Sequence, residues 1–314
     1  MAQKTWNPPD LSGKVAVVAG ATRGAGRAIA VSLGEAGATV YCTGRSVRGN
    51  LASGANRPET IDETAEMVTA QGGKGIAVRT DHTEVDQVSA LFERVRQEQQ
   101  GRLDVLVNDI WGGEQLTDWE NPFWEASLEN GLLMQRRAVW SHMITSRFGV
   151  PLLVARGAGL VVEVTDGWTY EYRGSLYYSL AKVSVIHLAE AMAAGLKEKG
   201  VTALAISPGF LRSEEMLYHF GVTESTWRDA AKKDKDFIAS ETPYYTGRAI
   251  AMLAADPKVS VKAGKAFYAG DLADEYSFND ADGNHPHWKR YFETNVREER
   301  EATNSTVMPL LAGQ

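Results

Sequence analysis

Tyr178 and Lys182 are the two residues whose types and spacing most directly suggest chemistry. They stand four positions apart at the start of a predicted helix over 178–199, so both side chains would share one helical face. A cation beside a phenol favours the phenolate and lowers its pKa from about 10. Such a tyrosine can exchange a proton with an alcohol or a carbonyl near neutral pH. In isolation, the same spacing is more often a pair on a helix surface.

A glycine-rich turn follows the predicted strand over 15–19. Gly20, Gly24 and Gly26, with Thr22 among them, allow a tight turn and a close approach of the backbone to a ligand. The helix predicted after the turn would offer the free N–H groups of its N-terminus to an anion. Because the spacing differs from G-x-G-x-x-G, the turn alone could also be purely structural.

Two arginines near the turn indicate whether it would bind NAD or NADP. A fold that binds NAD usually carries Asp or Glu after its second strand, to hold the ribose 2′-OH. Here that position reads Thr43-Gly44-Arg45, without an acid, and Arg23 lies inside the glycine turn. Guanidinium groups fork onto phosphate oxygens, so the pair would suit a 2′-phosphate. The alternative is that both arginines are solvated on loops. We expect NADP (NADPH) as the cofactor.

The candidate residues named above are far apart in the sequence, so they can form one site only in a fold that brings the ends of several strands together. Short apolar runs alternate with helix-like segments, and near-continuous apolar strands indicate a sheet covered on both faces. The alternation predicts parallel βαβ units, and hence an α/β fold with a single-domain, doubly wound, Rossmann-type parallel sheet and helices on both faces. Ligands of such sheets bind beyond the carboxyl ends of the strands. The predicted strands are 15–19, 38–43, 75–80, 105–107, 160–164, 201–206 and 266–269, and the predicted helices are 27–36, 60–71, 85–95, 123–148 and 178–199.

The order of these features resembles the short-chain dehydrogenase/reductase family over about residues 11–270. Three runs, 101–108, 159–167 and 268–283, further resemble one subgroup of that family. The resemblance implies hydride transfer between a nicotinamide and a carbonyl or alcohol. The residues that carry the family pattern are, in chain order, the glycine turn, Asp81, Asn108, Tyr178, Lys182, Pro208 and Gly209.

The resemblance also implies a role for each of these residues. In the family the glycine turn binds the pyrophosphate, Tyr178 is the proton donor, and Lys182 holds the ribose and lowers the pKa of the tyrosine. Asp81 and the residue after it flank the adenine, and Ser213 stands where a Thr usually contacts the carboxamide. The expected cofactor-binding residues are Gly20, Thr22, Arg23, Gly24, Gly26, Arg45, Asp81, His82, Asn108, Tyr178, Lys182, Pro208, Gly209 and Ser213.

The catalytic half of the family pattern is altered at the end of the fifth strand, where a serine is usual. Counting back from Tyr178 gives Thr165, whereas aligning the strand gives Asp166, which we prefer. Thr165 keeps a hydroxyl that could polarise a carbonyl. An ionised Asp166 would raise the pKa of Tyr178, and a protonated one could donate a hydrogen bond to the carbonyl oxygen.

Two further departures lie elsewhere in the pattern. The family's Asn-Asn-Ala-Gly run reads Asn108-Asp109-Ile110-Trp111 followed by two glycines. The family's catalytic Asn on the fourth helix has no clear counterpart, and the segment 135–137 (Gln-Arg-Arg) lies in that region. These departures affect the proton relay and leave the cofactor residues intact.

Composition excludes several classes of function. The chain has 314 residues and a net charge of −7, which is not the basic footprint of a nucleic-acid-binding domain. No apolar run approaches the length of a membrane span. A single cysteine, Cys42, excludes an internal disulfide and fits a reducing, cytoplasmic setting. His285 and His287 lack a supporting ligand pattern, so we expect no metal.

We expect three parts in the chain: an N-terminal arm over 1–10, an NADP-binding catalytic domain over 11–280, and a tail over 281–314. Within the domain, 45–57 reads as a loop insertion and 212–241 as a possible substrate lid. Aromatic residues that follow strand ends or adjoin the reactive tyrosine predict an aromatic-walled substrate pocket. These are Trp111, Trp168, Tyr177 and Phe210.

The leading interpretation is an NADP(H)-dependent oxidoreductase with a small-molecule carbonyl or alcohol as substrate. Tyr178 exchanges the proton with the help of Lys182, and either Asp166 or Thr165 assists. The family resemblance implies a homodimer or homotetramer. The alternative, favoured by the missing serine, is a nucleotide-binding sensor or scaffold that keeps an NADP site and has little or no turnover.

Overall fold

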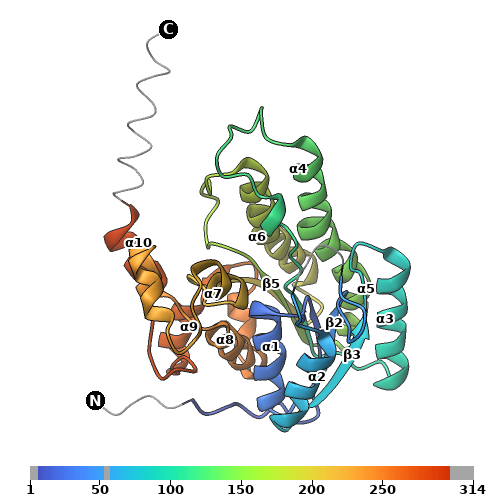
Figure 1. The fold of residues 1–314 in the computed structure, drawn as a ribbon. Helices are drawn as coiled ribbons and strands as arrows, with labels where there is room; N and C mark the ends of the chain where they lie inside the picture. Colours follow the sequence, from blue (N-terminus) through green and yellow to red (C-terminus); the bar gives the residue numbers. More distant parts are fainter. Residues whose placement is uncertain (1–5, 53–56, 298–314) are drawn as a thin grey trace.

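Seven parallel strands form one sheet in the order β3-β2-β1-β4-β5-β6-β7 (Figure 1). The computed structural model describes residues 6–52 and 57–297. The strand order reverses between β1 and β4, and this switch point is where ligands bind in such sheets. The predicted fold class is therefore confirmed. The strands are β1 (Val15–Ala19), β2 (Thr39–Gly44), β3 (Lys74–Arg79), β4 (Val105–Asn108), β5 (Gly159–Val164), β6 (Val201–Ser207) and β7 (Ala266–Tyr268).

Helices cover both faces of this sheet (Figure 1). On one face α1 packs between α2 and α8, and α9 packs on α8; on the other, α5 packs between α3 and α6. α6 is apolar and long enough to cross a membrane by length and composition alone, but here it lies against β5 and β6. These helices are α1 (Gly24–Glu35), α2 (Ile61–Ala70), α3 (Val85–Glu98), α5 (Ser141–Arg156), α6 (Leu176–Leu196), α8 (Pro243–Ala255) and α9 (Ala269–Tyr276).

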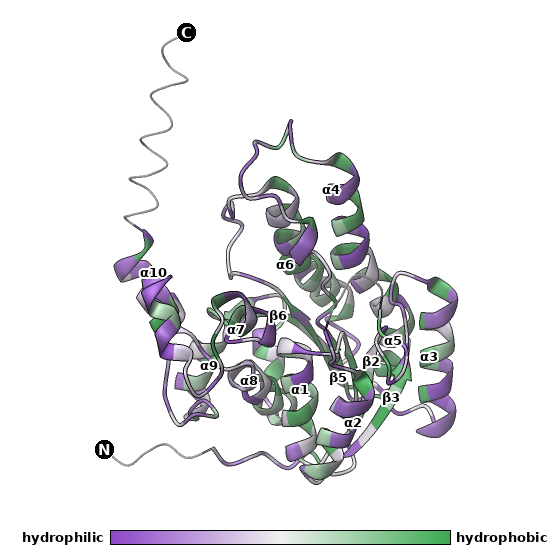
Figure 2. Ribbon diagram, viewed as in Figure 1, coloured by the Kyte–Doolittle hydropathy of each residue, from purple (hydrophilic) through white to green (hydrophobic). Residues whose placement is uncertain are grey.

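Alternation along each strand divides the core in two. In β1, Ala16 and Val18 join the cluster beneath α1 and α8, whereas Val15 and Val17 join the cluster beneath α3 and α5. Successive strand residues point to opposite faces, so an uninterrupted apolar strand can serve both cores. Figure 2 shows the result, with hydrophobic strands in the centre and hydrophilic residues on the outer sides of helices such as α3.

The predicted helix over 123–148 is wrong in its boundaries. Residues 122–126 form turns, and α4 (Leu128–Gln135) begins after Ser127, whose hydroxyl caps it by accepting the Asn130 N–H. A π-helical turn, η2 (Arg136–Trp140), then joins α4 to α5. Such turns depend on packing around the helix rather than on apolar periodicity, so the sequence pattern did not separate the segments.

The predicted lid over 212–241 folds around a small apolar core of its own, formed by Phe220, Trp227, Ala230 and Phe237. The short helix α10 (Trp288–Asn295) lies within the predicted tail. Parts of the predicted arm, loop insertion and tail, namely 1–5, 53–56 and 298–314, lie outside the described residues. This segment, 212–241, keeps the name lid below, although its closing role stays a prediction; it comprises α7 (Glu214–Phe220) and the 3₁₀ turns η3 (Trp227–Lys232) and η4 (Lys235–Ala239).

Candidate active site

A cavity of about 1170 Å³ opens beyond the carboxyl ends of β1, β2, β4 and β5. Its walls come from the glycine turn, the loops after β2, β3 and β4, the start of α6, the loop after β6 and the lid. The fold thus gathers residues that are far apart in sequence. The predicted site residues that line it are Gly20, Thr22, Arg23, Gly24, Arg45, Asp81, His82, Trp111, Thr165, Asp166, Tyr178, Lys182, Pro208, Gly209, Phe210 and Ser213.

Two predicted substrate-pocket residues lie away from this cavity. Tyr177 precedes Tyr178 by one position, which turns it about 100° around the helix, and its ring lies on Gly131 of α4. Trp168 turns towards β7, with its ring 5.8 Å from that of Tyr268. Position in sequence next to a reactive residue or a strand end did not determine which way either ring points. Both assignments to the substrate pocket are corrected.

Two predicted cofactor residues support the cavity without lining it. The position of a Cβ on Gly26 would be 2.3 Å from the Gly20 carbonyl oxygen, so this glycine serves backbone packing. Asn108 is fully buried and donates hydrogen bonds to Ser146 and Glu163. We therefore place Asn108 under the cavity, where it links β4 to α5 and β5, rather than against a cofactor.

The glycine turn packs its backbone tightly against the loop after β4. A Cβ on Gly20 would lie 2.3 Å from the Asp109 carbonyl oxygen, and Gly20 has a φ of +94° that other residues rarely adopt. Gly24 begins α1, and its N–H donates to the carboxylate of Glu214 at 2.8 Å. The start of α1 thus already holds an anionic oxygen from the lid, as expected of a helix N-terminus.

Three arginines line the cavity: Arg23, Arg45 and Arg57. Arg23 and Arg57 both pair with Glu59, each at 3.3 Å. Sequence reasoning missed Arg57, which lies in the predicted loop insertion. The number of arginines in the 45–57 loop was the available signal, but only the fold shows that the Arg57 side chain lines the cavity. This cluster of guanidinium groups has the chemistry of a phosphate site.

Asp81 and His82 lie just beyond the end of β3, and Arg45, which follows β2, lies close to Asp81. Burial alone would raise the pKa of Asp81, but hydrogen bonds from Thr83 and the nearby Arg45 hold that pKa below its ordinary value. Burial lowers the pKa of His82 to about 3, so its ring is neutral and bonds Thr43 on one side. Asp81 is therefore the charged member of the pair.

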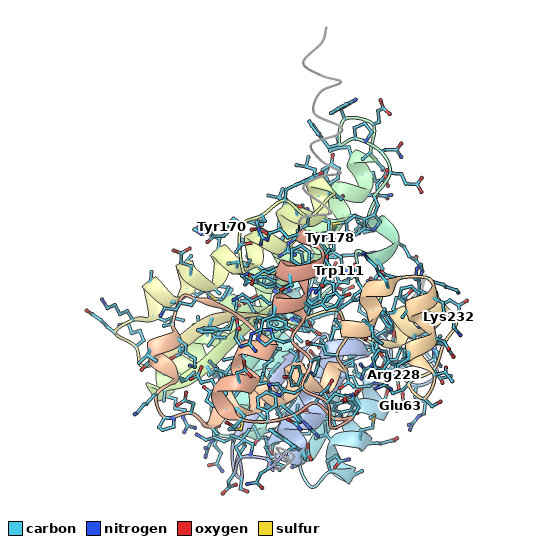
Figure 3. All side chains as sticks on the ribbon, turned by 90° about the vertical axis from the view of Figure 1, so that its left-hand side faces the viewer. Glu63, Trp111, Tyr170, Tyr178, Arg228 and Lys232 are labelled. Carbon is cyan, nitrogen blue, oxygen red and sulfur yellow. The ribbon has the colours of Figure 1, made fainter. Side chains whose placement is uncertain are left out.

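Tyr178 meets the end of β5 through Asp166. The phenol donates to Asp166 Oδ2 at 2.8 Å, and Trp111 lies beside the phenol ring, 5.5 Å away edge to face (Figure 3). Thr165 instead donates its hydroxyl to the Lys182 backbone carbonyl at 2.7 Å. The two residues follow β5 directly, and their side chains point to different partners, so only Asp166 contacts the phenol. Of the two alternatives left open by the sequence, the structure brings Asp166 to Tyr178.

The pKa of Tyr178 is raised in this structure, whereas the sequence-based expectation was a pKa lowered by Lys182. Burial and the carboxylate of Asp166 raise the pKa of the phenol well above its ordinary value. The Lys182 Nζ lies 3.7 Å from the centre of the Trp111 ring and 5.5 Å from that of the Tyr178 ring. The phenol is therefore neutral and carries a proton that it can donate.

Three carboxyl groups and burial act in opposite directions on the pKa of Lys182. Burial lowers the pKa of Lys182, whereas Asp166, Asp109 and Glu114 favour the ammonium form. Burial also raises the pKa of Asp109 to about 7 and that of Glu114 above its ordinary value. Perturbed groups gathered in one cavity are typical of a catalytic centre.

The sequence profile of the short chain dehydrogenases matches residues 14–219. The chain belongs to this family. Membership makes it an oxidoreductase of alcohol or carbonyl groups that uses NAD or NADP. The subgroup to which the three sequence runs point is dehydrogenase/reductase member 1, and the relatives below agree with it.

The most similar relatives include mouse and human proteins named dehydrogenase/reductase SDR family member 1. The chain is 34% identical to the mouse protein over 277 residues (87% of this chain, 85% of the relative) and 33% identical to the human protein over 276 residues (87% and 85%). A short chain dehydrogenase structure from Mycobacterium thermoresistibile has a TM-score of 0.72 at 20% identity, covering 89% of this chain and 95% of that one. A Beutenbergia cavernae structure with NADP bound at low occupancy has a TM-score of 0.66 at 24% identity, covering 84% and 97%.

In the present chain, segment 135–137 stands where the family carries its catalytic Asn, and its side chains make other contacts. The Gln135 side chain donates to the Tyr177 carbonyl oxygen at 2.8 Å, and Arg137 donates to the Gly112 carbonyl oxygen at 3.1 Å. Arg136 pairs with Glu84. Of these side chains only that of Arg137 lines the cavity, so the segment offers no amide in place of that Asn.

A buried glutamate fixes the loop after β6. Glu241 accepts the Gly209 N–H at 2.9 Å and the Tyr268 hydroxyl at 2.8 Å, and burial raises its pKa to about 8. The same Tyr268 hydroxyl accepts the N–H of Trp288 at 2.7 Å, which brings this tail residue to the cavity wall. Sequence reasoning missed this network because its members come from four separate segments.

Proposed function

We propose that this protein is an NADP(H)-dependent oxidoreductase that interconverts a small-molecule carbonyl compound and its alcohol. The observation that carries the proposal is the contact of Tyr178 with Asp166 in the cavity that also holds Lys182, Arg23 and Arg45. A proton donor and a phosphate-binding cluster then share one space. The proposed catalytic residues are Tyr178, Lys182, Asp166 and, through its bond to the Lys182 backbone, Thr165 as a positioning residue.

The residues present fit a dinucleotide. The Gly24 N–H, which already binds a carboxylate, would hold a pyrophosphate oxygen, and Arg45 and Arg23 would hold a 2′-phosphate. Asp81 adjoins the same end, as an adenine-flanking residue should. When bound, the nicotinamide supplies or accepts a hydride at its C4. Ser213 stands beside Gly24 at the other side of the turn, with its Cβ 3.9 Å from the position of a Gly24 Cβ.

The raised pKa of Tyr178 suits carbonyl reduction. Burial and Asp166 keep the phenol protonated at neutral pH, so the proton is present when a carbonyl oxygen becomes an alkoxide. For this donation the phenol must turn from Asp166 Oδ2 to the substrate oxygen. Lys182 adds positive charge beside that oxygen, which stabilises the developing negative charge.

Aromatic side chains form the proposed substrate wall. Trp111 and Phe210, both expected from sequence, are joined by Trp119, whose ring lies 5.0 Å from that of Tyr178. Trp288 also reaches this wall from α10. We infer that the substrate presents an apolar body next to its carbonyl group.

A screen of carbonyl and alcohol compounds with both cofactors tests the proposal. The absorbance of the reduced nicotinamide should change with NADPH or NADP⁺ and at least one apolar carbonyl or alcohol. Binding of NADPH without turnover across the panel would favour the alternative, a nucleotide-binding sensor or scaffold.

Replacing Arg45 with Asp should narrow or reverse the preference for NADPH over NADH. The substitution removes a guanidinium suited to a 2′-phosphate and adds a carboxylate suited to a free 2′-OH. Dissociation constants of both cofactors, measured by fluorescence titration, check this prediction. If the wild-type protein binds NADH more tightly than NADPH, the assignment of Arg45 is wrong.

We further propose a cytoplasmic homodimer or homotetramer. Large apolar side chains are exposed on neighbouring helices: Leu128 and Leu132 on α4, Trp140 at the end of η2, Met143 on α5, and Leu180 on α6. Exposed apolar surface of this kind is typical of a protein–protein interface. The described residues up to 280 form one sheet with its helices, which supports a single catalytic domain. The free, buried thiol of Cys42 supports a reducing compartment.

Replacing Leu132 and Trp140 together with Glu should convert the oligomer to a monomer. Two charges in an apolar interface would remain unpaired and would have to be desolvated. Light scattering coupled to size-exclusion chromatography measures the mass. Val261→Glu is the control, because Val261 is exposed on a different part of the molecule and should leave the mass unchanged. A monomeric wild-type protein would contradict the proposal.

A further inference from the structure

The lid helix α7 holds a carboxylate against the start of α1. Glu214 Oε2 accepts the Gly24 N–H at 2.8 Å, although the two residues are 190 positions apart in the chain. The next residue, Glu215, pairs with Arg57. Two consecutive lid carboxylates therefore engage two groups that line the cavity at its phosphate-binding end.

A second arginine of the cavity wall, Arg23, is also paired with an acid of this chain. Arg23 and Arg57 share Glu59, which lies between them in the structure. Burial would raise the pKa of Glu59, but its hydrogen bonds and the two arginines keep that pKa below its ordinary value. The acids from the lid and from the loop after β2 thus supply negative charge to groups suited to phosphate.

The Glu214 contact and a bound pyrophosphate exclude one another. The Gly24 N–H has one hydrogen, which a carboxylate oxygen and a phosphate oxygen cannot both take at full strength. Two anions placed side by side also repel, and more strongly in a partly enclosed cavity than in water. Cofactor binding at the start of α1 therefore requires Glu214 to leave.

We propose that Glu214 is an internal competitor of the cofactor pyrophosphate. In the free protein it anchors the lid over the cavity, and dinucleotide binding displaces it and releases α7. This inference rests on the proposed function, since it takes the dinucleotide as the ligand of the glycine turn. Glu214 thereby sets cofactor affinity without contacting the reacting atoms.

Fluorescence titration with NADPH tests the competitor role. Glu214→Gln keeps the shape of the side chain and removes its charge, so it should bind NADPH about twofold to fivefold more tightly than the wild type, the range expected for one charge interaction at a helix N-terminus. Asp229→Asn is the matched control. Asp229 lies on the same lid, pairs with the exposed Lys232, and is absent from the cavity wall (Figure 3 labels Lys232). Its loss should leave the affinity unchanged.

A ligand without pyrophosphate provides the second comparison. Adenosine 2′-monophosphate carries only the 2′-phosphate, so Glu214→Gln should leave its affinity unchanged. If the wild type binds NADPH and Glu214→Gln binds it no more tightly, the competitor role is wrong while the proposed function stands. An equal gain in Asp229→Asn would also overturn it, because net charge would then explain the effect. If neither protein binds NADPH or NADH, the proposed function and the competitor role fail together.

Discussion

Tyr178→Phe should reduce kcat for carbonyl reduction by about 10²- to 10⁴-fold, the range of a lost general acid. The phenyl ring keeps its packing against Trp111 and Trp119 but carries no proton. Binding of NADPH should be nearly unchanged, because the phosphate-binding groups lie elsewhere in the cavity. Steady-state rates followed by NADPH absorbance, together with a fluorescence titration, measure both quantities.

Tyr177→Phe is the control for this experiment. It removes the same hydroxyl from the adjacent residue, whose ring lies on Gly131 of α4 and outside the cavity. Turnover should stay close to that of the wild type. Equal turnover in wild type and Tyr178→Phe would show that the proton comes from another group.

Asp166→Ala should lower kcat by a factor of about 10 to 1000, taking the cost of one lost hydrogen-bonding group in a catalytic site as the upper guide. The change removes the side chain that holds the Tyr178 hydroxyl. Asp166→Asn should retain substantial activity, because the amide can still bond to the phenol. Thr165→Val should be mild, since its hydroxyl bonds only the Lys182 backbone carbonyl. The reverse ranking, with Thr165→Val severe and Asp166→Ala mild, would move the role to the threonine hydroxyl.

The pH profile of Asp166→Asn separates a chemical role from a structural one. Reduction needs the protonated phenol, so it is lost as pH rises through the raised pKa of Tyr178. Removing the Asp166 charge lowers that pKa, so the alkaline loss of reduction should move to lower pH. Alcohol oxidation needs the phenolate, and its rise should move in the same direction. If the rate falls equally at every pH and the midpoints of the pH profile stay where they are in the wild type, Asp166 acts through packing.

Features encoded in neighbouring residues could be predicted from the sequence. The positions of the strands follow from apolar runs, and the glycine turn and the Tyr178–Lys182 pair lie within eight residues each. α8 was missed, although Thr242 before Pro243 is a helix-start signal that could have located it. That helix matters to the site because it packs closely on α1, where the position of a Cβ on Gly247 would be 2.6 Å from the Ala28 carbonyl oxygen.

Features that depend on distant segments could not be predicted in the same way. The contact of Glu214 with Gly24 requires the lid to fold back on the first helix, and the inward turn of Arg57 requires Glu59 and Glu215 as partners. The raised pKa of Tyr178 has the same origin, because burial and the direction of Asp166 are properties of the folded cavity. The residue types were enough to identify the reactive groups in the sequence. Their protonation states depend on how they are packed in the folded protein.

Deuterium transfer from NADPH labelled at the nicotinamide C4 tests the proposed hydride transfer most directly. Wild-type protein is incubated with labelled NADPH and a panel of apolar carbonyl compounds, and the alcohol products are analysed by mass spectrometry. We expect deuterium on the former carbonyl carbon of at least one product, at a rate that Tyr178→Phe reduces as described above. Tight binding of NADPH with no deuterium in any product would contradict hydride transfer and support a nucleotide-binding protein without turnover.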